Sequence, residues 1–305
     1  MALYAMRRLL LAIPTLLGIS LITFLLVRVS GDPARFVLGE TATPEAIAQF
    51  RQENGLDLPL YEQFVRYNLN VLRGDFGESL RYKQPVVELF AERIQATLEL
   101  GIAAYLVAVI VGVSTGVFTA VRAGSLSDKL ARIMVLFGQA VPGFYLGLVL
   151  IIVVSVKLGW LPTGGREGLK HLILPTITLS SYLVAVIVRF TRSVMLDVLH
   201  QDYMRTARAK GLREQTAIWR HALPNAMIPL LTILALQSSV VFSGAVVTET
   251  VFSWPGIGRF AVAAIQTRDY PVVQGTVLIL TSFVVLLNIV VDLAYAWLDP
   301  RIRYS

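Results

Sequence analysis

Ser114 lies in the one stretch of this sequence whose spacing resembles a catalytic motif, Gly112-Val-Ser-Thr-Gly116. The pattern G-x-S-x-G places a reactive serine on a sharp turn between a strand and a helix. Here it falls in the middle of a long apolar run, and the same residues form G-x-x-x-G, which is typical of close packing between membrane helices. We therefore interpret the two glycines as a packing face rather than as part of a hydrolase site.

Other catalytic and metal-binding patterns are missing from the sequence. Without any cysteine, the chain has no disulfide, thiolate metal site or cysteine nucleophile. No lysine follows a glycine, so the phosphate loop G-x-x-x-x-G-K-[ST] is absent and the chain is not itself a P-loop ATPase. His171, His200 and His221 are not spaced as a pair of metal ligands. We expect a protein that is not an enzyme and that holds no cofactor or metal of its own.

The composition indicates a protein that crosses a membrane several times. Hydrophobic residues make up 55% of the chain and charged residues only 15%. A helix needs roughly 20 apolar residues to cross a hydrocarbon core of about 30 Å. Six runs meet this requirement, near residues 9–27, 97–121, 133–156, 171–189, 226–247 and 272–297. The net charge of +7 does not indicate nucleic-acid binding, because the cationic residues cluster beside these runs.

The positive-inside rule predicts the orientation of the six spans. Fourteen Lys and Arg residues fall in the segments that an N-in, C-in topology places in the cytoplasm, against five in the two short outer loops. Residues 1–29 then form an N-terminal transmembrane helix, residues 30–96 an extracytoplasmic domain, and residues 97–305 a five-helix core. The expected fold is an all-α membrane protein with six transmembrane helices.

Several local signals refine this picture. In the outer domain, Thr43 is expected to cap a helix that has Pro44 at its first position, and a second helix is expected over Leu60–Leu72. The third span is expected to run as one helix from Ile133 to Val156 despite Pro142. An outer amphipathic segment covers residues 249–270, with Trp254 expected at the membrane interface.

The other organising feature is a polar segment, residues 191–225, between the fourth and fifth spans. We expect two short helices in it, Tyr203–Lys210 and Leu212–Leu223, bent at Gly211 and interrupted by Pro224. Such a segment is suited to docking a cytoplasmic partner. An ordinary basic loop that obeys the positive-inside rule is the alternative.

The polar segment resembles the E-A-A-x3-G-x9-I-x-L-P signature of permease subunits of bacterial ABC importers. Ala207, Gly211, Leu223 and Pro224 match it, whereas Arg205, Thr206 and His221 stand at its Glu, Ala and Ile positions. The form YMRTARAKG is similar to that of the peptide-importer branch. Four other stretches resemble the same branch, in order along the chain: GDPAR, GLDLPLYEQF with LRGDFGESL, ETVFSWPGIGR and DPRIRY.

The resemblance implies a function for the whole chain. It implies a first permease subunit of an importer of di- or oligopeptides, or of glutathione, in the bacterial inner membrane. Its partners would be a second homologous permease, two P-loop ATPases that bind ATP and Mg, an extracytoplasmic binding protein and the lipid bilayer, with no nucleic acid. A permease for nickel or another small solute is the alternative, and a self-contained secondary transporter is a further one.

The resemblance also implies roles for particular residues. The polar segment would be the coupling helix, seated on an ATPase, with these residues as the coupling set: Tyr203, Arg205, Thr206, Ala207, Arg208, Gly211, Leu212, Leu223 and Pro224. Gly211 would supply the bend. Polar residues within the spans are candidates for the translocation path, namely Gln139, Gln237, Ser238 and Asn288. Hydrogen bonding between helices is the alternative role for each of these four.

Overall fold

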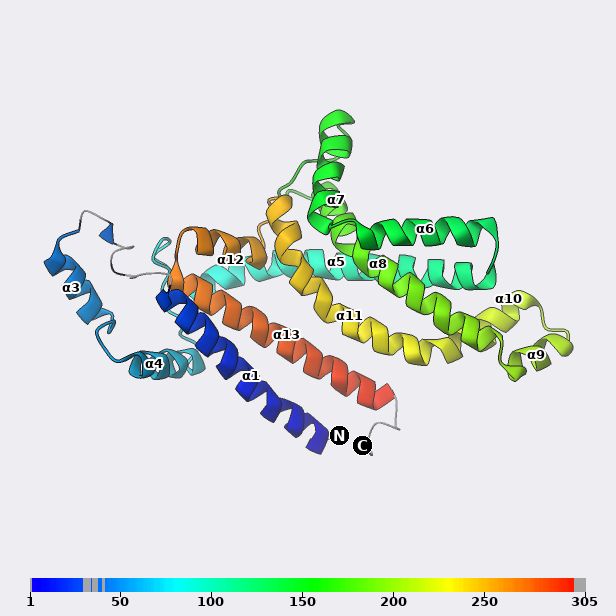
Figure 1. The fold of residues 1–305 in the computed structure, drawn as a ribbon, viewed down its shortest axis with the longest axis horizontal. Coiled ribbons are helices and arrows are strands. Elements are labelled where there is room, and N and C mark those ends of the chain that lie inside the picture. The colour runs from blue at the N-terminus through cyan, green and yellow to red at the C-terminus, as the bar shows by residue number, and fades with distance from the viewer. Residues whose placement is uncertain (1, 30–33, 35–37, 40–41, 299–305) are drawn as a thin grey trace. The chain divides into compact units, whose positions relative to one another are not determined.

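The computed structural model describes residues 2–29, 34, 38–39 and 42–298, and this part of the chain is helical without any strand (Figure 1). Five helices are long and apolar enough to cross a membrane. They become six if the bent pair Leu126–Ala140 and Gly143–Lys157 counts as one span. The expected all-α class is therefore confirmed, with five or six candidate spans.

The chain forms two compact units, which we describe separately. Unit 1 comprises residues 96–255 and the chain from Val290, and unit 2 comprises residues 2–95 and 256–289. Helices α5 (Val86–Val121) and α13 (Tyr270–Leu298) contribute residues to both units.

Helix α8 (Leu169–Leu199) is the centre of unit 1. It packs against α6 (Leu126–Ala140), α7 (Gly143–Leu150) and α11 (Leu223–Val251). It extends ten residues beyond the fourth span that the sequence predicts, because its apolar face continues through the buried residues Met195 and Leu199. The first nine residues of the polar segment therefore belong to this long helix.

Helix α5 lies close to α8 because its contact face carries small residues. Ala104 and Ala108 are buried in a core that also contains Leu183 and Ile187 of α8. At Gly112 an added Cβ would lie 2.6 Å from Ile187, and at Gly116 it would lie 2.5 Å from Thr191. Only glycine fits at these distances, so the structure confirms that the G-x-S-x-G stretch is a packing face.

The third expected span is not a single straight helix. Helix α6 ends at Ala140 and α7 begins at Gly143, and the two helices form an angle of 104° (Figure 1). Val141 is extended, as expected for a residue before proline, and Pro142 has no N–H to continue the hydrogen-bond ladder. Residues Ile151–Lys157 then form a π-helical turn, η1.

Trp254, expected at the membrane interface, is buried within the protein rather than exposed at its surface. Its side chain is completely buried in the core of unit 1, and its indole N–H donates to the carbonyl of Ala96 at 2.8 Å. Beside it the buried carboxylate of Glu249 accepts a hydrogen bond from Thr97 at 2.6 Å. These contacts bind the end of α11 to the first unit-1 turn of α5, since a buried indole N–H needs a partner within the protein.

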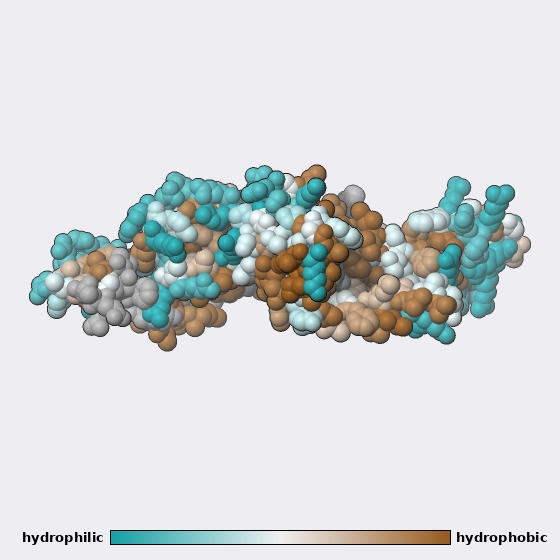
Figure 2. Space-filling model, turned by 90° about the horizontal axis from the view of Figure 1, so that it is seen from above, coloured by the Kyte–Doolittle hydropathy of each residue, from teal (hydrophilic) through white to brown (hydrophobic). Residues whose placement is uncertain are grey.

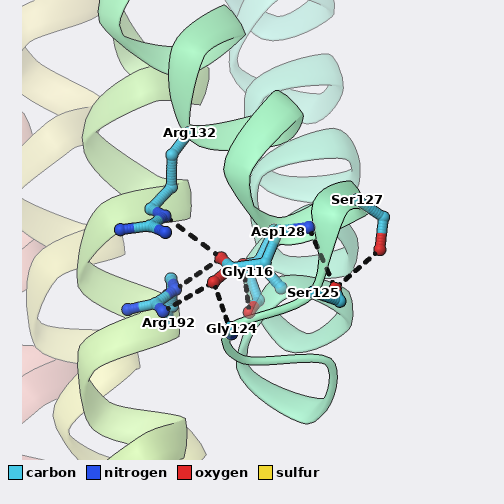
Figure 3. Close-up of polar contacts among 8 residues, drawn as sticks. Gly116, Gly124, Ser125, Ser127, Asp128, Arg132 and Arg192 are labelled. Carbon is cyan, nitrogen blue, oxygen red and sulfur yellow. Dashed lines mark hydrogen bonds and ion pairs between the residues drawn. The ribbon is translucent and has the colours of Figure 1, made fainter.

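A buried carboxylate joins α6 to α8 at the other end of unit 1 (Figure 3). Asp128, in the first turn of α6, is completely buried and accepts two hydrogen bonds from the guanidinium of Arg192, both at 3.0 Å. Arg132 approaches the same carboxylate at 3.3 Å, and the backbone N–H of Gly124 donates to it at 3.0 Å. Ser125 caps α6 by accepting from the Asp128 N–H. The α5–α6 turn is thus tied to α8 by charge-assisted bonds.

Unit 2 begins with the apolar helix α1 (Ala2–Val29) and contains both helices expected for the outer domain. Helix α3 (Pro44–Glu53) has Thr43 as its N-cap and Pro44 at its start, and α4 (Leu60–Leu72) has the expected bounds. The two expected helices are confirmed. Helix α4 packs against α1 through an edge-to-face contact of Phe24 and Phe64.

The rest of unit 2 is held by a small apolar core and one acidic side chain. Val86, Leu89, Phe260 and Val272 share this core, which brings α5 together with α12 (Ile257–Gln266) and α13. Asp269, buried between α12 and α13, accepts from the Ser79 hydroxyl at 2.5 Å and from the backbone N–H groups of residues 80 and 81. This carboxylate fixes the loop that leads into α5.

Replacement of Asp128 by asparagine should destabilise unit 1. The variant keeps the shape of the side chain but leaves Arg192 without its main counter-charge. We expect the free energy of unfolding to fall by about 3 kcal/mol. This value is at the low end for a broken buried ion pair, because Arg192 keeps some contact with solvent. The midpoint of thermal unfolding of the purified protein in detergent measures the effect.

Glu99→Gln is the matched control for this prediction. It breaks the ion pair of Glu99 with Arg166 (2.6 Å), in which both side chains are about one-third exposed. An exposed pair contributes up to about 1 kcal/mol, so this midpoint should fall much less. Equal shifts of the unfolding midpoint in the two variants would show that the buried ion pair of Asp128 contributes no more to stability than the exposed pair of Glu99.

Candidate coupling segment and translocation cavity

The polar segment folds as a short helix, a glycine turn and a second helix. Helix α9 (Asp202–Ala209) is followed by Gly211 and then by α10 (Glu214–Ala217). In Figure 2 the region of α9 and α10, at the right, carries hydrophilic surface next to apolar surface. The bend therefore lies where the sequence predicts it.

Gly211 has the backbone conformation that the turn requires. Its φ is +78°, in the left-handed region, and its N–H donates to the carbonyl of Arg208 at 2.9 Å. An added Cβ would meet no atom within 4 Å. Glycine is therefore favoured here by backbone conformation and not by lack of space.

An ion pair crosses the same turn. Arg208 at the end of α9 donates to Glu214 at the start of α10, through Nη2 at 2.8 Å and Nε at 3.1 Å. Hydrogen bonding to Glu214 raises the pKa of the Arg208 guanidinium. Both side chains are about half exposed, so the pair contributes little to stability but holds the two helices in register.

Helix α9 is seated on the second apolar core of unit 1. Met204 is buried there, together with Met195 of α8 and Leu230 of α11. The core also includes residues of α5, α10 and η2 (Ile218–Ala222), a π-helical turn. Helix α9 therefore shares one packed core with α8 and α11.

The expectation that Pro224 interrupts the second helix is wrong. The backbone passes from α10 through η2 into α11 without leaving the helical region. Pro224 lies in the first turn of α11, and the wider π-turn before it accommodates the residue that cannot donate. The helix thus continues from the coupling segment into a long membrane helix.

The expected coupling residues divide into two groups by burial. Ala207 is buried, and Leu223 is half-buried and contacts the second core. The others lie on the exposed side of the segment: Tyr203, Arg205, Thr206, Arg208, Gly211, Leu212 and Pro224. The Arg205 side chain is 74% exposed and forms an ion pair with Asp202, at 3.3 Å. The exposed group forms a surface available to a partner.

A cavity of about 280 Å³ lies between α7, α8 and α11. Its polar lining comes mainly from Thr178, Ser181 and Tyr182 of α8 and from Thr248 of α11. The sequence analysis missed these residues because small hydroxyl side chains are common inside membrane helices. The feature of the sequence that could have identified them is the spacing of three and four residues along α8, which places them on one face of the helix.

The four expected path residues lie at different places. Gln139 lines a second cavity, of about 450 Å³, between α6 and α8. The Ser238 hydroxyl donates to the carbonyl of Ala235 in its own helix at 2.7 Å, and Gln237 is half-buried beside it on α11. Asn288 is an exposed residue of α13 in unit 2. Within unit 1, only Gln139 of this set lines either cavity.

Two family models match the chain and together cover nearly all of it. The family described as "Binding-protein-dependent transport system inner membrane component" matches residues 112–304. The family described as "Binding-prot-dependent transport system membrane comp, N-term" matches residues 1–101.

Individual relatives agree with the family models. The chain is 45% identical over 303 residues to the "Glutathione transport system permease protein GsiC" of Escherichia coli strain K12, covering 99% of each chain. The protein of the same name from Salmonella paratyphi A gives the same identity and coverage.

Solved structures show the same fold. Two crystal forms of the inward-facing MetNI methionine ABC transporter match 70% and 69% of this chain, and 97% and 96% of the solved chains. The TM-scores are 0.56 and 0.59 at 16% and 18% identity, so this likeness concerns the fold alone. With a family model that matches residues 112–304 and relatives matched over the full length, the chain belongs to the family of binding-protein-dependent transport system inner membrane components, the multi-pass permeases of ABC importers.

Proposed function

We propose that this chain forms, with a second homologous permease, the translocation path of an ATP-driven importer of di- or oligopeptides or of glutathione. The observation that carries the proposal is the seating of α9 on the second core, with Tyr203, Arg205 and Leu212 left exposed. The relatives named as glutathione permeases support the class of substrate.

The proposed orientation places both ends of the chain and the coupling segment in the cytoplasm. The excess of Lys and Arg in these segments supports it. One of two ATPase subunits would then contact the exposed residues of α9, and both subunits would bind ATP and Mg. An extracytoplasmic binding protein would deliver the solute from the opposite side.

The structure suggests how movement at the ATPases reaches the path. Helix α9 and the inner ends of α8 and α11 share one core, so they would shift together. Helices α8 and α11 also line the 280 Å³ cavity. Closure of the ATPases would thus move the helices that form the cavity walls. They would move as rigid bodies, because packed helices do not deform continuously.

Purification from the native membrane in a gentle detergent, followed by mass spectrometry, tests the proposed assembly. We expect recovery of a second permease, P-loop ATPases and a binding protein, whose ligand identifies the substrate. A chain that is recovered alone in several detergents, as a monomer or homo-oligomer, would contradict the proposal and favour a self-contained transporter.

Gly211→Val should impair coupling without preventing membrane insertion. Valine at positive φ costs about 1–3 kcal/mol, so the turn between α9 and α10 should rearrange. We expect a large loss of uptake by the reconstituted importer, with normal amounts of the chain in the membrane.

Gly159→Val is the matched control. Gly159 also has a positive φ, +65°, and open space around its Cβ position, but it lies after η1 rather than in the coupling segment. Uptake should be largely retained in this variant. Normal uptake with Gly211→Val would remove that glycine from the coupling mechanism.

Arg205→Glu tests the exposed charge of α9. Arg205 stands at the Glu position of the family signature, and we propose that it faces a carboxylate on the ATPase. We expect loss of uptake, because a negative charge at this position would be repelled by that carboxylate. A compensating acidic-to-basic change in the ATPase should restore uptake. If no such exchange at the contact surface restores it, the proposed ion pair is wrong.

A further inference from the structure

Three arginines line the cavity of about 450 Å³ between α6 and α8. Arg132 comes from α6, and Arg189 and Arg192 come from successive turns of α8. Asp197 is the one acidic residue of the lining. Asp128 lies behind these arginines and pairs with Arg192. When it is counted with the lining residues, the site has three positive and two negative charges, and its net charge is +1.

Two of these arginines are held in place from behind. The buried carboxylate of Asp128 binds Arg192 through two hydrogen bonds at 3.0 Å and Arg132 at 3.3 Å (Figure 3). Arg189 has no ion-pair partner in the described part of the chain, and its side chain is exposed. The cavity thus combines two fixed guanidinium groups with one that is available to a ligand.

The arginine cavity lies on the same face of α8 as the cavity proposed as the translocation path. Thr178 and Tyr182 line the first cavity, and Arg189 and Arg192 line the second. Their spacings of four, seven and three residues correspond to one side of a helix. The second cavity therefore lies further along the same face of α8, toward the end that leads into α9.

Guanidinium groups recognise carboxylates through paired charge-assisted hydrogen bonds. A bare metal cation would be repelled by the net positive charge, which disfavours a nickel ion as the solute. We propose that this cavity binds a carboxylate of the transported solute near the cytoplasmic end of the path. The inference rests on the proposed function and adds that the solute is a carboxylate-bearing molecule, as peptides and glutathione are.

A cysteine probe in the cavity tests the proposal in the assembled importer. The chain has no cysteine, so Ser193→Cys, an exposed lining position, introduces one thiol that mass spectrometry can follow. We expect an anionic, sulfonate-bearing thiosulfonate to modify it at least about threefold faster than a cationic one, because the arginines concentrate anions locally. A peptide with a free C-terminal carboxylate should slow the reaction, whereas the same peptide with an amidated C-terminus should not.

Two variants identify the residue responsible. In the Ser193→Cys background, Arg189→Gln should remove both the preference for the anionic reagent and the protection by the free acid. Arg122→Gln is the matched control, since it removes an exposed charge at the end of α5 that lies outside this cavity. That control should leave both effects intact.

The contrary results are distinct from failure of the proposed function. An unreactive thiol, equal rates for the two reagents, or equal protection by acid and amide would overturn the proposal. Protection that appears only in vesicles containing anionic phospholipid would assign the cavity to a lipid headgroup and would also overturn it. ATP-driven uptake by the wild-type importer is measured separately, and its absence alone would contradict the proposed function.

Discussion

Close contact between α5 and α8 is the constraint on which the rest of unit 1 depends. Gly112 and Gly116 allow Ile187 and Thr191 to lie where a larger side chain would collide with them. Because lipid is as apolar as the helix surfaces, association in a membrane depends on such packing rather than on the hydrophobic effect. The contact sets the position of α8, and α8 in turn carries α9 and one wall of both cavities.

Three buried carboxylates and one buried indole bind one segment to another. Glu249 and Trp254 join the end of α11 to α5, Asp128 joins α6 to α8, and Asp269 joins a loop to the start of α13. Each of these groups has hydrogen-bond partners, as the cost of burying a charge or an N–H requires.

The family signature separates into parts with different physical roles. Ala207 is buried and Leu223 contacts the core, Gly211 supplies positive φ, and Arg205 with its exposed neighbours forms a surface. A linear motif does not show this division, because burial depends on which helix the residue meets. The same argument applies to Asp128, which appears in the sequence as one acid in a basic loop.

Periodicity and local chemistry determined much of this protein from the sequence alone. Long apolar runs require helices, because backbone groups in lipid need internal partners, and Thr43, Pro44 and Gly211 act within a few residues of themselves. Tertiary structure decided what depends on distant contacts. It decided the 104° break after α6, the π-turn that accommodates Pro224, the burial of Trp254 against Ala96, and the meeting of Arg132, Arg189 and Arg192 around one cavity. Those outcomes follow from which helix faces come together, and no spacing within a single helix specifies that.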